Sequence, residues 1–175
     1  AAFGRQTVLM LSSLKEYKGT REFIELANRL PQYKFVLVIN DVQENIDSFL
    51  YKYNIFCSQN LIIYPRQNNV VPFYNEASIV INLTDKKLAV ETFGLTALEA
   101  MSAGLPVIVP TEGGIAEMVT DGENGYKIDV QDLNKIVEYV HLLLSDQELY
   151  NKLSNNASAY SRNFNIDKMT ESILS

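Results

Sequence analysis

The sequence predicts a doubly wound α/β fold, in which helices cover both faces of a mainly parallel sheet. Short continuous apolar runs alternate about six times with segments whose apolar residues recur at helical spacing. The runs lack the polar alternation of a half-exposed strand, so each is expected to be covered on both faces. The succession of strand, helix and strand favours parallel pairing.

The predicted strands are short apolar runs that end at polar or turn-forming residues. The first two, residues 7–11 and 35–39, flank a helix and form the first parallel unit. The complete set is residues 7–11, 35–39, 61–64, 78–82, 107–109 and 126–128.

The predicted helices carry apolar residues three or four apart. Thr20 is placed to cap the first of them, and Pro31 ends it. Asp129 or Asp132 is placed to cap a later helix that contains residues 133–144. The other predicted helices span residues 42–52, 71–77, 95–103, 115–119 and 146–160, and a separate short helix covers residues 166–174.

Residues 90–109 are interpreted as a loop, a helix and a buried strand, and the rest of the chain is organised around them. Gly104 is positioned for a left-handed helix cap, and Pro106 prevents the helix from continuing. Glu91 falls just before the helix and Glu99 in its second turn. Because the amides of a first helical turn have no partner within the helix, this helix start is a candidate anion site.

Length and composition indicate one globular domain of ordinary make-up. The chain has 175 residues, of which 47% are apolar and 21% are charged, which is enough to build a core. Its formal net charge of -6 argues against a general nucleic-acid surface. An anionic ligand would therefore need local positive groups.

Cysteine use and the lengths of the apolar runs bear on the compartment. The single cysteine, Cys57, excludes an internal disulfide framework and fits a reducing compartment, so we expect a cytoplasmic protein. No apolar run approaches the ~20 residues that a membrane span needs, and the N-terminus lacks the features of a signal peptide. Because the first residue is Ala1 and a strand begins almost at once, we expect a piece of a longer chain.

Three polar loops follow predicted strands, at residues 12–19, 83–94 and 110–114. In a doubly wound sheet the carboxyl ends of the strands form one edge, and ligands bind beyond it. We therefore expect the three loops to gather at one site, to which the first loop contributes Lys15 and Lys18.

A series of residues in the second half of the chain matches a known family. Glu91-Thr92-Phe93-Gly94-Leu95 is followed in order by Leu98-Glu99-Ala100-Met101, Gly104, Pro106-Val107, Gly113-Gly114, Glu117 and Gly125. With these residues the chain resembles the C-terminal, donor-binding domain of retaining GT-B glycosyltransferases of the family 4 or group 1 type. The resemblance runs from Thr7 to Phe164.

The resemblance implies a Rossmann-like half of a GT-B fold, in which residues 1–175 form the nucleotide-sugar-binding C-terminal domain. It places the N-terminal acceptor domain outside this chain and suggests that residues 160–175 pack against it. The implied ligands are a nucleoside diphosphate sugar and an acceptor glycan or lipid-linked glycan. The family suggests a role in bacterial surface polysaccharide or glycolipid synthesis, with the full-length protein at the inner face of a membrane.

The resemblance also assigns site residues. Glu91 would reach the hydroxyls of the donor sugar and act with Lys18 in catalysis, while Glu99 would accept hydrogen bonds from the ribose. Without the family pattern, Glu99 reads as part of the solvated face of an ordinary helix, and Gly104 as simple helix punctuation. The other donor-binding residues that it implies at the helix start are Phe93, Gly94, Leu95 and Thr96, whose amides would meet the sugar or the diphosphate.

The first loop departs from the family pattern. The family has an arginine and a lysine five residues apart, and here Ser13 occupies the arginine position while Lys18-Gly19 matches the lysine. Lys18 is therefore the better candidate to neutralise the diphosphate as it leaves. Lys15 either substitutes for the missing arginine or is a solvent-exposed loop charge.

Two other segments have both a functional and a structural interpretation. Tyr64-Pro65-Arg66 follows the third strand, where the resemblance suggests that the ring of Tyr64 or the guanidinium plane of Arg66 stacks on the nucleotide base. Alternatively, Tyr64 packs on its own sheet. Residues 111–114 either approach the donor sugar or simply turn into the next helix.

The sequence predicts no metal and no cofactor. It has no Cys/His cluster and no Asp-any-Asp loop, and its one histidine, His141, is expected to be structural. Two other functions stay open at this point. One is a nucleotide-sugar epimerase with the same architecture, and the other is a non-enzymatic α/β module that uses this edge for protein contacts.

Overall fold

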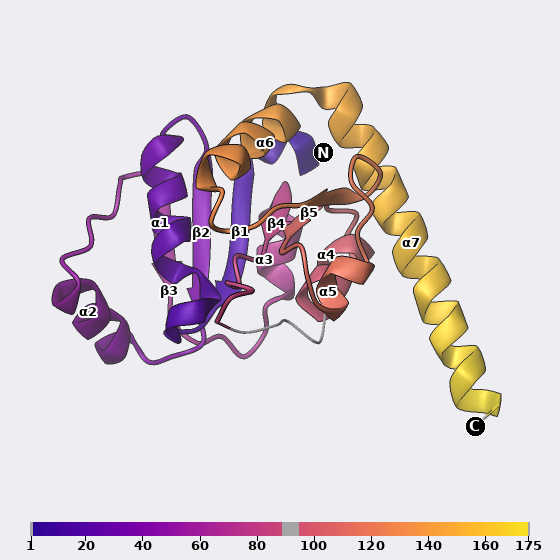
Figure 1. Ribbon diagram of the computed structural model, residues 1–175, viewed down its shortest axis with the longest axis horizontal. Helices are drawn as coiled ribbons and strands as arrows, with labels where there is room; N and C mark the ends of the chain where they lie inside the picture. Colours follow the sequence, from indigo (N-terminus) through magenta and orange to yellow (C-terminus); the bar gives the residue numbers. More distant parts are fainter. Residues whose placement is uncertain (1, 89–94, 175) are drawn as a thin grey trace.

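The structure, a computed structural model, contains one sheet with helices on both of its faces (Figure 1). It describes residues 2–88 and 95–174, and side chains as far as Phe164. The strands are β1 (Thr7–Ser12), β2 (Lys34–Ile39), β3 (Leu61–Tyr64), β4 (Ile79–Ile81), β5 (Val107–Val109) and β6 (Gly125–Lys127). The helices are α1 (Thr20–Arg29), α2 (Gln43–Lys52), α3 (Val71–Glu76), α4 (Leu95–Ser102), α5 (Gly114–Glu117), α6 (Leu133–Ser145) and α7 (Gln147–Leu174), with 3-10 turns η1 (Ala2–Arg5) and η2 (Glu16–Lys18).

The predicted doubly wound α/β fold is confirmed. The six strands are all parallel and lie in the order β3-β2-β1-β4-β5-β6. Each predicted strand is present, and its ends lie within one residue of the prediction. The apolar runs therefore located the strands well, because each run is buried and bounded by polar residues.

Two details of the predicted helices are wrong. The final segment is not a separate helix, since α7 continues unbroken from Gln147 to Leu174. That stretch holds no glycine or proline, the residues that most strongly end a helix. Thr20 does not cap α1 either, because Gly19 occupies the N-cap position and Thr20 is already the first helical residue. At α6 the capping residue is Asp132, whose side chain accepts from the Lys135 amide.

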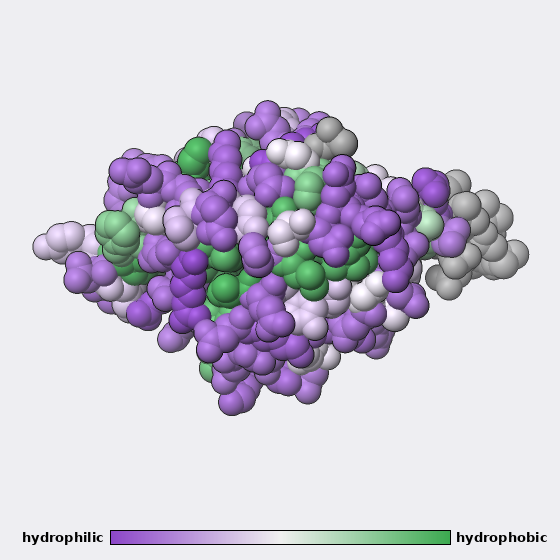
Figure 2. Space-filling model, turned by 90° about the horizontal axis from the view of Figure 1, so that it is seen from above, coloured by the Kyte–Doolittle hydropathy of each residue, from purple (hydrophilic) through white to green (hydrophobic). Residues whose placement is uncertain are grey.

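The core forms two layers, one on each face of the sheet. Leu9 and Met10 are neighbours in β1 and point to opposite faces, yet each is 1% exposed. One layer packs the sheet against α1 and α6, and the other packs it against α3, α4 and α5. Seen from above, the surface is mostly hydrophilic, with apolar residues in hollows near its middle (Figure 2). Most of the driving force for folding therefore comes from these two buried layers.

The sheet order determines where a ligand can bind. From β1 the chain proceeds through β2 to β3 on one side, whereas β4, β5 and β6 follow one another on the other side. The order thus reverses between β1 and β4. In open α/β sheets the loops on either side of such a reversal separate and leave a crevice beyond the carboxyl ends of the strands.

The end of α4 has the left-handed cap that the sequence predicts. Gly104 has a φ of 76°, its amide donates to the carbonyl of Met101 (2.9 Å), and the Leu105 amide donates to the carbonyl of Ala100 (3.0 Å). This pair of bonds is a Schellman motif. The Gly104 carbonyl also accepts from the Ser154 hydroxyl of α7 at 2.6 Å. Gly104 is therefore a structural residue that ends α4 and docks it on α7.

One edge of the sheet is formed by β3, which pairs with β2 alone among the described strands. It is four residues long, and Pro65 follows it directly. Ile62, in its middle, is 40% exposed. The core is thus thinner at this edge than around β1 and β4.

Candidate functional site

A cavity of about 240 Å³ lies where the strand order reverses. Its wall comes from the ends of β1, β2 and β4, from the loops that follow them, and from the first turn of α4. We call it the switch-point cavity. It is lined by Met10, Leu11, Ser12, Ser13, Lys18, Asn40, Asn82, Leu83, Thr84 and Thr96.

Two of the predicted loops contact each other at this cavity because of Gly19. Gly19 has a φ of 81°, and a Cβ atom there would lie 2.5 Å from both the Cβ and the carbonyl oxygen of Leu83. No side chain fits in that space. Next to it, the Asp85 amide donates to the Tyr17 carbonyl at 2.8 Å. The loops after β1 and β4 are therefore fixed to each other, as the sequence predicts.

Hydroxyl groups hold the loop after β1 in shape. The Ser12 and Thr20 hydroxyls are 2.9 Å apart, and Thr20 Oγ1 donates to the Ser13 carbonyl at 2.9 Å. Ser12 Oγ also donates to the Lys18 carbonyl at 3.3 Å. Thr20 is 3% exposed, so these bonds are largely protected from water. Sequence reasoning missed this network, because Thr20 in front of a helical pattern suggested a cap.

The structure distinguishes the two candidate lysines. Lys18 lines the switch-point cavity and is half-buried, with its Nζ 5.5 Å from the centroid of the Tyr17 ring. Lys15 is exposed and lines a different cavity, of about 400 Å³, between this loop and α2. Of the described residues that line the switch-point cavity, Lys18 is the cationic one. Lys15 therefore fits better as a solvent-exposed loop charge than as a replacement for the arginine.

Ser13 lines the same cavity but offers it no charge. Its Oγ accepts from the Lys15 amide at 3.4 Å, within the turn of the loop. The arginine that the family has at this position would bring a second cation to the cavity. Here the cationic charge of the described wall rests on Lys18.

The start of α4 reaches the cavity through Thr96, which is half-buried and lines it. Leu95, the first residue of α4, is 59% exposed. The other residues predicted here, Glu91, Phe93 and Gly94, lie outside the described residues, so their roles stay predictions.

Glu99 lies one turn further along α4 and does not line the cavity. Its side chain is exposed, and its Oε2 accepts a hydrogen bond of 2.9 Å from the phenol of Tyr74 in α3. Tyr74 is 4% exposed. Burial, followed by the hydrogen bond and the charge of Glu99, raises the pKa of the Tyr74 phenol. Sequence reasoning did not find Tyr74, which was only part of the short helix predicted over residues 71–77.

Arg66 does not line the cavity but supports a residue that does. Its Nε donates to Asn40 Oδ1 at 2.8 Å, and its backbone amide donates to the Asp41 carbonyl at 2.9 Å. Asn40 directly follows β2 and lines the cavity. Tyr64 packs edge-on against Phe73 of α3 with the ring centroids 5.0 Å apart, so its described ring contact is with a covering helix and not with its own sheet.

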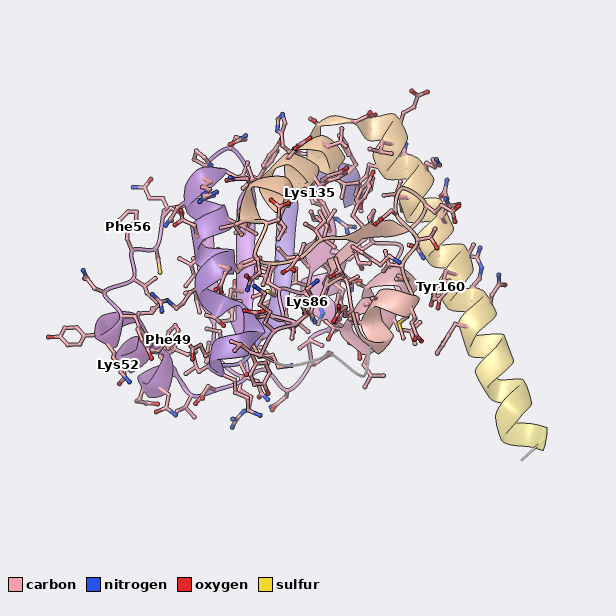
Figure 3. The ribbon with its side chains drawn as sticks, viewed as in Figure 1. Phe49, Lys52, Phe56, Lys86, Lys135 and Tyr160 are labelled. Atoms are coloured by element: carbon pink, nitrogen blue, oxygen red, sulfur yellow. The ribbon has the colours of Figure 1, made fainter. Side chains whose placement is uncertain are left out.

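Lys86, which is labelled in Figure 3, contacts residues of two other loops at this edge. Its Nζ donates to Thr111 Oγ1 at 3.0 Å and lies 3.2 Å from Asp129 Oδ2 and 3.9 Å from Glu112 Oε1. These groups follow β4, β5 and β6. Burial opposes the ionisation of Asp129, but the Gln131 amide and the Lys86 ammonium outweigh it and lower the pKa of Asp129. Sequence reasoning had placed Lys86 in the loop without a role.

Residues 111–114 turn into α5, as the structural interpretation predicts, with Gly113 at a φ of 100° in the N-cap position. His141 also has structural surroundings, because its Nδ1 lies 2.7 Å from the phenol oxygen of Tyr33.

Within residues 2–88 and 95–174, no group of three or more His, Cys, Asp or Glu side chains is arranged to hold a metal ion. In the same part of the chain, no helix is both long and apolar enough to cross a bilayer.

Comparison with known families identifies the chain. The family of glycosyl transferases group 1 matches residues 3–160. The chain belongs to this family. The resemblance seen in the motif series is therefore confirmed.

Relatives of the chain carry glycosyltransferase names. An uncharacterized glycosyltransferase of Haemophilus influenzae is 28% identical over 177 residues, which cover 98% of this chain and 48% of the relative. N-acetyl-alpha-D-glucosaminyl L-malate synthase of Bacillus anthracis is 31% identical over 104 residues, which cover 59% of this chain and 26% of that enzyme. The chain thus spans half or less of the length of these two curated relatives.

Solved structures share the fold. HepE of Anabaena, crystallised with UDP and glucose, superposes with a TM-score of 0.79 at 19% identity and covers 97% of this chain and 48% of its own. The C-terminal domain of the group 1 glycosyl transferase LpcC from Francisella tularensis superposes with a TM-score of 0.73 at 23% identity. That match covers 93% of this chain and 92% of the LpcC domain. The chain therefore has the fold of one half of a GT-B glycosyltransferase.

Proposed function

We propose that residues 1–175 are the nucleotide-sugar-binding C-terminal domain of a retaining, hexosyl-type glycosyltransferase. The complete enzyme would move a sugar from a nucleoside diphosphate sugar to an acceptor, with the acceptor domain outside this chain. The observation that carries the proposal is the switch-point cavity, which combines the Lys18 ammonium with the first turn of α4 in a chain of group 1.

The proposed roles follow from charge and position. When the bond between the anomeric carbon and the diphosphate breaks, negative charge accumulates on the leaving phosphate. The Lys18 ammonium and the amides of the α4 start, including those of Leu95 and Thr96, would stabilise that charge. Glu91 would bind the sugar hydroxyls at the same helix start. Phe93 and Gly94 would contribute amides next to it.

The nucleoside would extend from the phosphates across the same edge. We assign the ribose to Glu99, whose carboxylate lies one turn from Thr96. The base would lie toward the end of β3, where Arg66 orients Asn40 at the cavity wall. No metal or cofactor is proposed for this chemistry, since cationic and amide groups supply the charge stabilisation.

The acceptor and the cellular setting are proposals drawn from the family resemblance. We propose an acceptor glycan or lipid-linked glycan in bacterial surface polysaccharide or glycolipid synthesis, and a cytoplasmic enzyme at the inner face of a membrane. A small-sugar acceptor is the second candidate, because trehalose synthase of Pyrococcus horikoshii is 28% identical over 183 residues, covering 95% of this chain.

Calorimetry and thermal shift of this chain with UDP, GDP and ADP test the proposal. HepE has been crystallised with UDP and with UDP-glucose, so we expect UDP to raise the unfolding temperature. If none of the three binds saturably, the donor-site assignment fails and a non-enzymatic α/β module is the better account. Epimerisation of a UDP-sugar by the full-length protein without any acceptor would instead support the epimerase.

A further inference from the structure

We infer that Tyr74 is a positioning residue for the nucleotide ribose, acting by orienting the Glu99 carboxylate. This inference rests on the proposed function, because it assigns to Tyr74 a part in the same donor site. Tyr74 does not line the cavity and is named by none of the sequence motifs.

The Tyr74 phenol fixes one oxygen of Glu99. The bond from Tyr74 to Glu99 Oε2 is 2.9 Å long, and Tyr74 itself is 4% exposed. An exposed glutamate on a helix normally samples several rotamers, each of which points its carboxylate differently. A buried phenol cannot follow it, so the bond selects the rotamer that keeps Oε2 against α3.

The other oxygen is thereby presented on the solvent side. Within the part of the chain that the structure describes, Glu99 Oε1 takes part in no hydrogen bond, and the Glu99 side chain is exposed. Thr96, which lines the cavity, lies three residues earlier in α4 and so about 60° around the helix. A ribose attached to phosphates at the helix start therefore passes this flank of α4, where one carboxylate oxygen can accept from its hydroxyls.

The phenol is suited to this role because it remains a donor. Burial, together with Glu99, raises the pKa of Tyr74, so the phenol is protonated at neutral pH. The helix that carries the Tyr74 phenol, α3, is also held in place by packing. Phe73, the preceding residue of α3, packs edge-on against Tyr64 at the end of β3. Since β3 leads into the segment assigned to the base, α3 links the base side of the site to the ribose side.

The simpler alternative is that Tyr74 only ties α3 to α4. A contact of that kind contributes to stability but does not change how strongly the domain prefers ribose to deoxyribose in the nucleotide. The two readings therefore differ in one measurable ratio, the dissociation constant of 2′-deoxyuridine or 3′-deoxyuridine diphosphate divided by that of UDP. We call this ratio the ribose preference.

The test is calorimetric titration of the wild-type chain and the Tyr74→Phe variant with UDP and both deoxy analogues. We expect Tyr74→Phe to weaken UDP binding about three- to tenfold, an effect the size of one ordinary hydrogen bond, because the Glu99 carboxylate stays but loses its fixed orientation. Binding of at least one deoxy analogue should change less, so the ribose preference falls. Glu99→Ala should abolish the preference, and adding Tyr74→Phe to it should have no further effect.

Tyr150→Phe is the matched control. Tyr150 is also a buried tyrosine, 2% exposed, and its phenol donates to the Ser78 carbonyl at 2.6 Å, far along the chain from Glu99. The same chemical change there should lower thermal stability and leave the ribose preference unaltered.

The outcomes separate the inference from the proposed function. If wild type binds UDP with a ribose preference that Glu99→Ala removes and Tyr74→Phe leaves intact, Tyr74 is a structural tie and the inference is wrong. If Glu99→Ala leaves the preference intact, the ribose role of Glu99 fails, and the inference fails with it. Absence of any nucleotide binding by wild type refutes the proposed function itself.

Discussion

Lys18 and Lys15 belong to the same loop, yet only Lys18 lines the switch-point cavity. The difference is set by η2 and Gly19, which turn the chain so that Lys18 is half-buried and Lys15 is exposed. A cation in a partly dehydrated site interacts with an anion more strongly than one in open water. In the proposed site, Lys18 would therefore neutralise most of the charge of the phosphates.

Lys18→Ala should weaken UDP binding about tenfold, because a charge-assisted hydrogen bond to phosphate is lost. In the full-length protein the same change should lower the rate of sugar transfer. Calorimetry on this chain and initial rates on the full-length enzyme measure the two effects. Lys15→Ala is the control from the same loop and should change binding less than twofold. Equal effects of the two substitutions would contradict the assignment.

Gly19→Ala should destabilise the domain by at least ~3 kcal/mol, because a Cβ at that position collides with the backbone of Leu83. Gly122 is the matched control, since it has a similar φ of 76° and no atom within 4 Å of an added Cβ. Gly122→Ala should cost only the strain of the left-handed conformation, ~1–2 kcal/mol. Urea unfolding of the two variants gives both values. A cost for Gly19→Ala no larger than that for Gly122→Ala would show that the two loops can separate freely.

Some residue roles were beyond the reach of the sequence for a physical reason. The motif favours Lys18 over Lys15, and of the two it is Lys18 that lines the switch-point cavity. Tyr74 and Lys86 were missed because each pairs with a residue 25 positions away, Glu99 and Thr111. No local periodicity or spacing marks such a pair, since it exists only after the sheet has brought the segments together.

At the scale of elements, the loops after β4, β5 and β6 act as one assembly because Lys86 joins them. The Lys86 and Asp129 side chains are 27% and 23% exposed, so water screens their attraction only in part. The loop after β4 leads toward residues 89–94, which include the candidate catalytic Glu91. Lys86 therefore helps to hold the loop after β4 in place, although it does not line the switch-point cavity.

The Lys86–Asp129 pair should make stability depend on acid pH. The pKa of Asp129 is lowered from 3.8 in the folded state, so its contribution to stability is complete above that value and is lost as the pH falls through the folded pKa. Lys86→Met removes part of the shift. We therefore expect the variant to lose less unfolding free energy than wild type between pH 5 and the acid range below 3.8.

Urea unfolding at a series of pH values measures this difference. Lys87→Met is the control, since Lys87 is exposed and acts on Asp129 only through the weakest of its interactions. Parallel pH profiles for wild type and Lys86→Met would show that the pair does not stabilise the fold.

Elements were predictable where their signals are local. Buried apolar runs gave the strands, and the Gly104–Pro106 spacing gave the end of α4. The break placed before residue 166 was wrong because asparagines lower helix propensity without ending a helix, and α7 continues. The sheet order is a different matter, since it depends on which strands pair across the whole chain. The sequence pattern predicts parallel strands but not that the order reverses beside β1.

At the scale of the whole molecule, we propose that a second domain covers the switch-point cavity in the complete enzyme. The switch-point cavity is about 240 Å³ and is bounded by one domain. Two-domain transferases exclude water by closing over the donor. Under this proposal, this domain alone would bind the nucleotide, while transfer would require the second domain.

We expect this chain to bind UDP and to transfer no sugar. The measurement is incubation with UDP-sugars and candidate acceptors, with product detected by mass spectrometry, beside the full-length protein as positive control. Robust transfer by the isolated chain would contradict the proposal that the acceptor site lies on another domain. The C-terminal domain of LpcC was crystallised as a separate domain, which supports testing the present chain without a second domain.

The short β3 strand has a consequence for solubility. A strand at the margin of a sheet leaves a row of unpaired amides and carbonyls that can recruit a strand from another molecule. Here that row is four residues long and apolar, from Leu61 to Tyr64, and Pro65 has no amide with which to extend it. A strand from another copy could therefore pair with β3 over only a few residues. The short length of this apolar edge strand and Pro65 thus protect the domain from aggregation through edge-to-edge pairing.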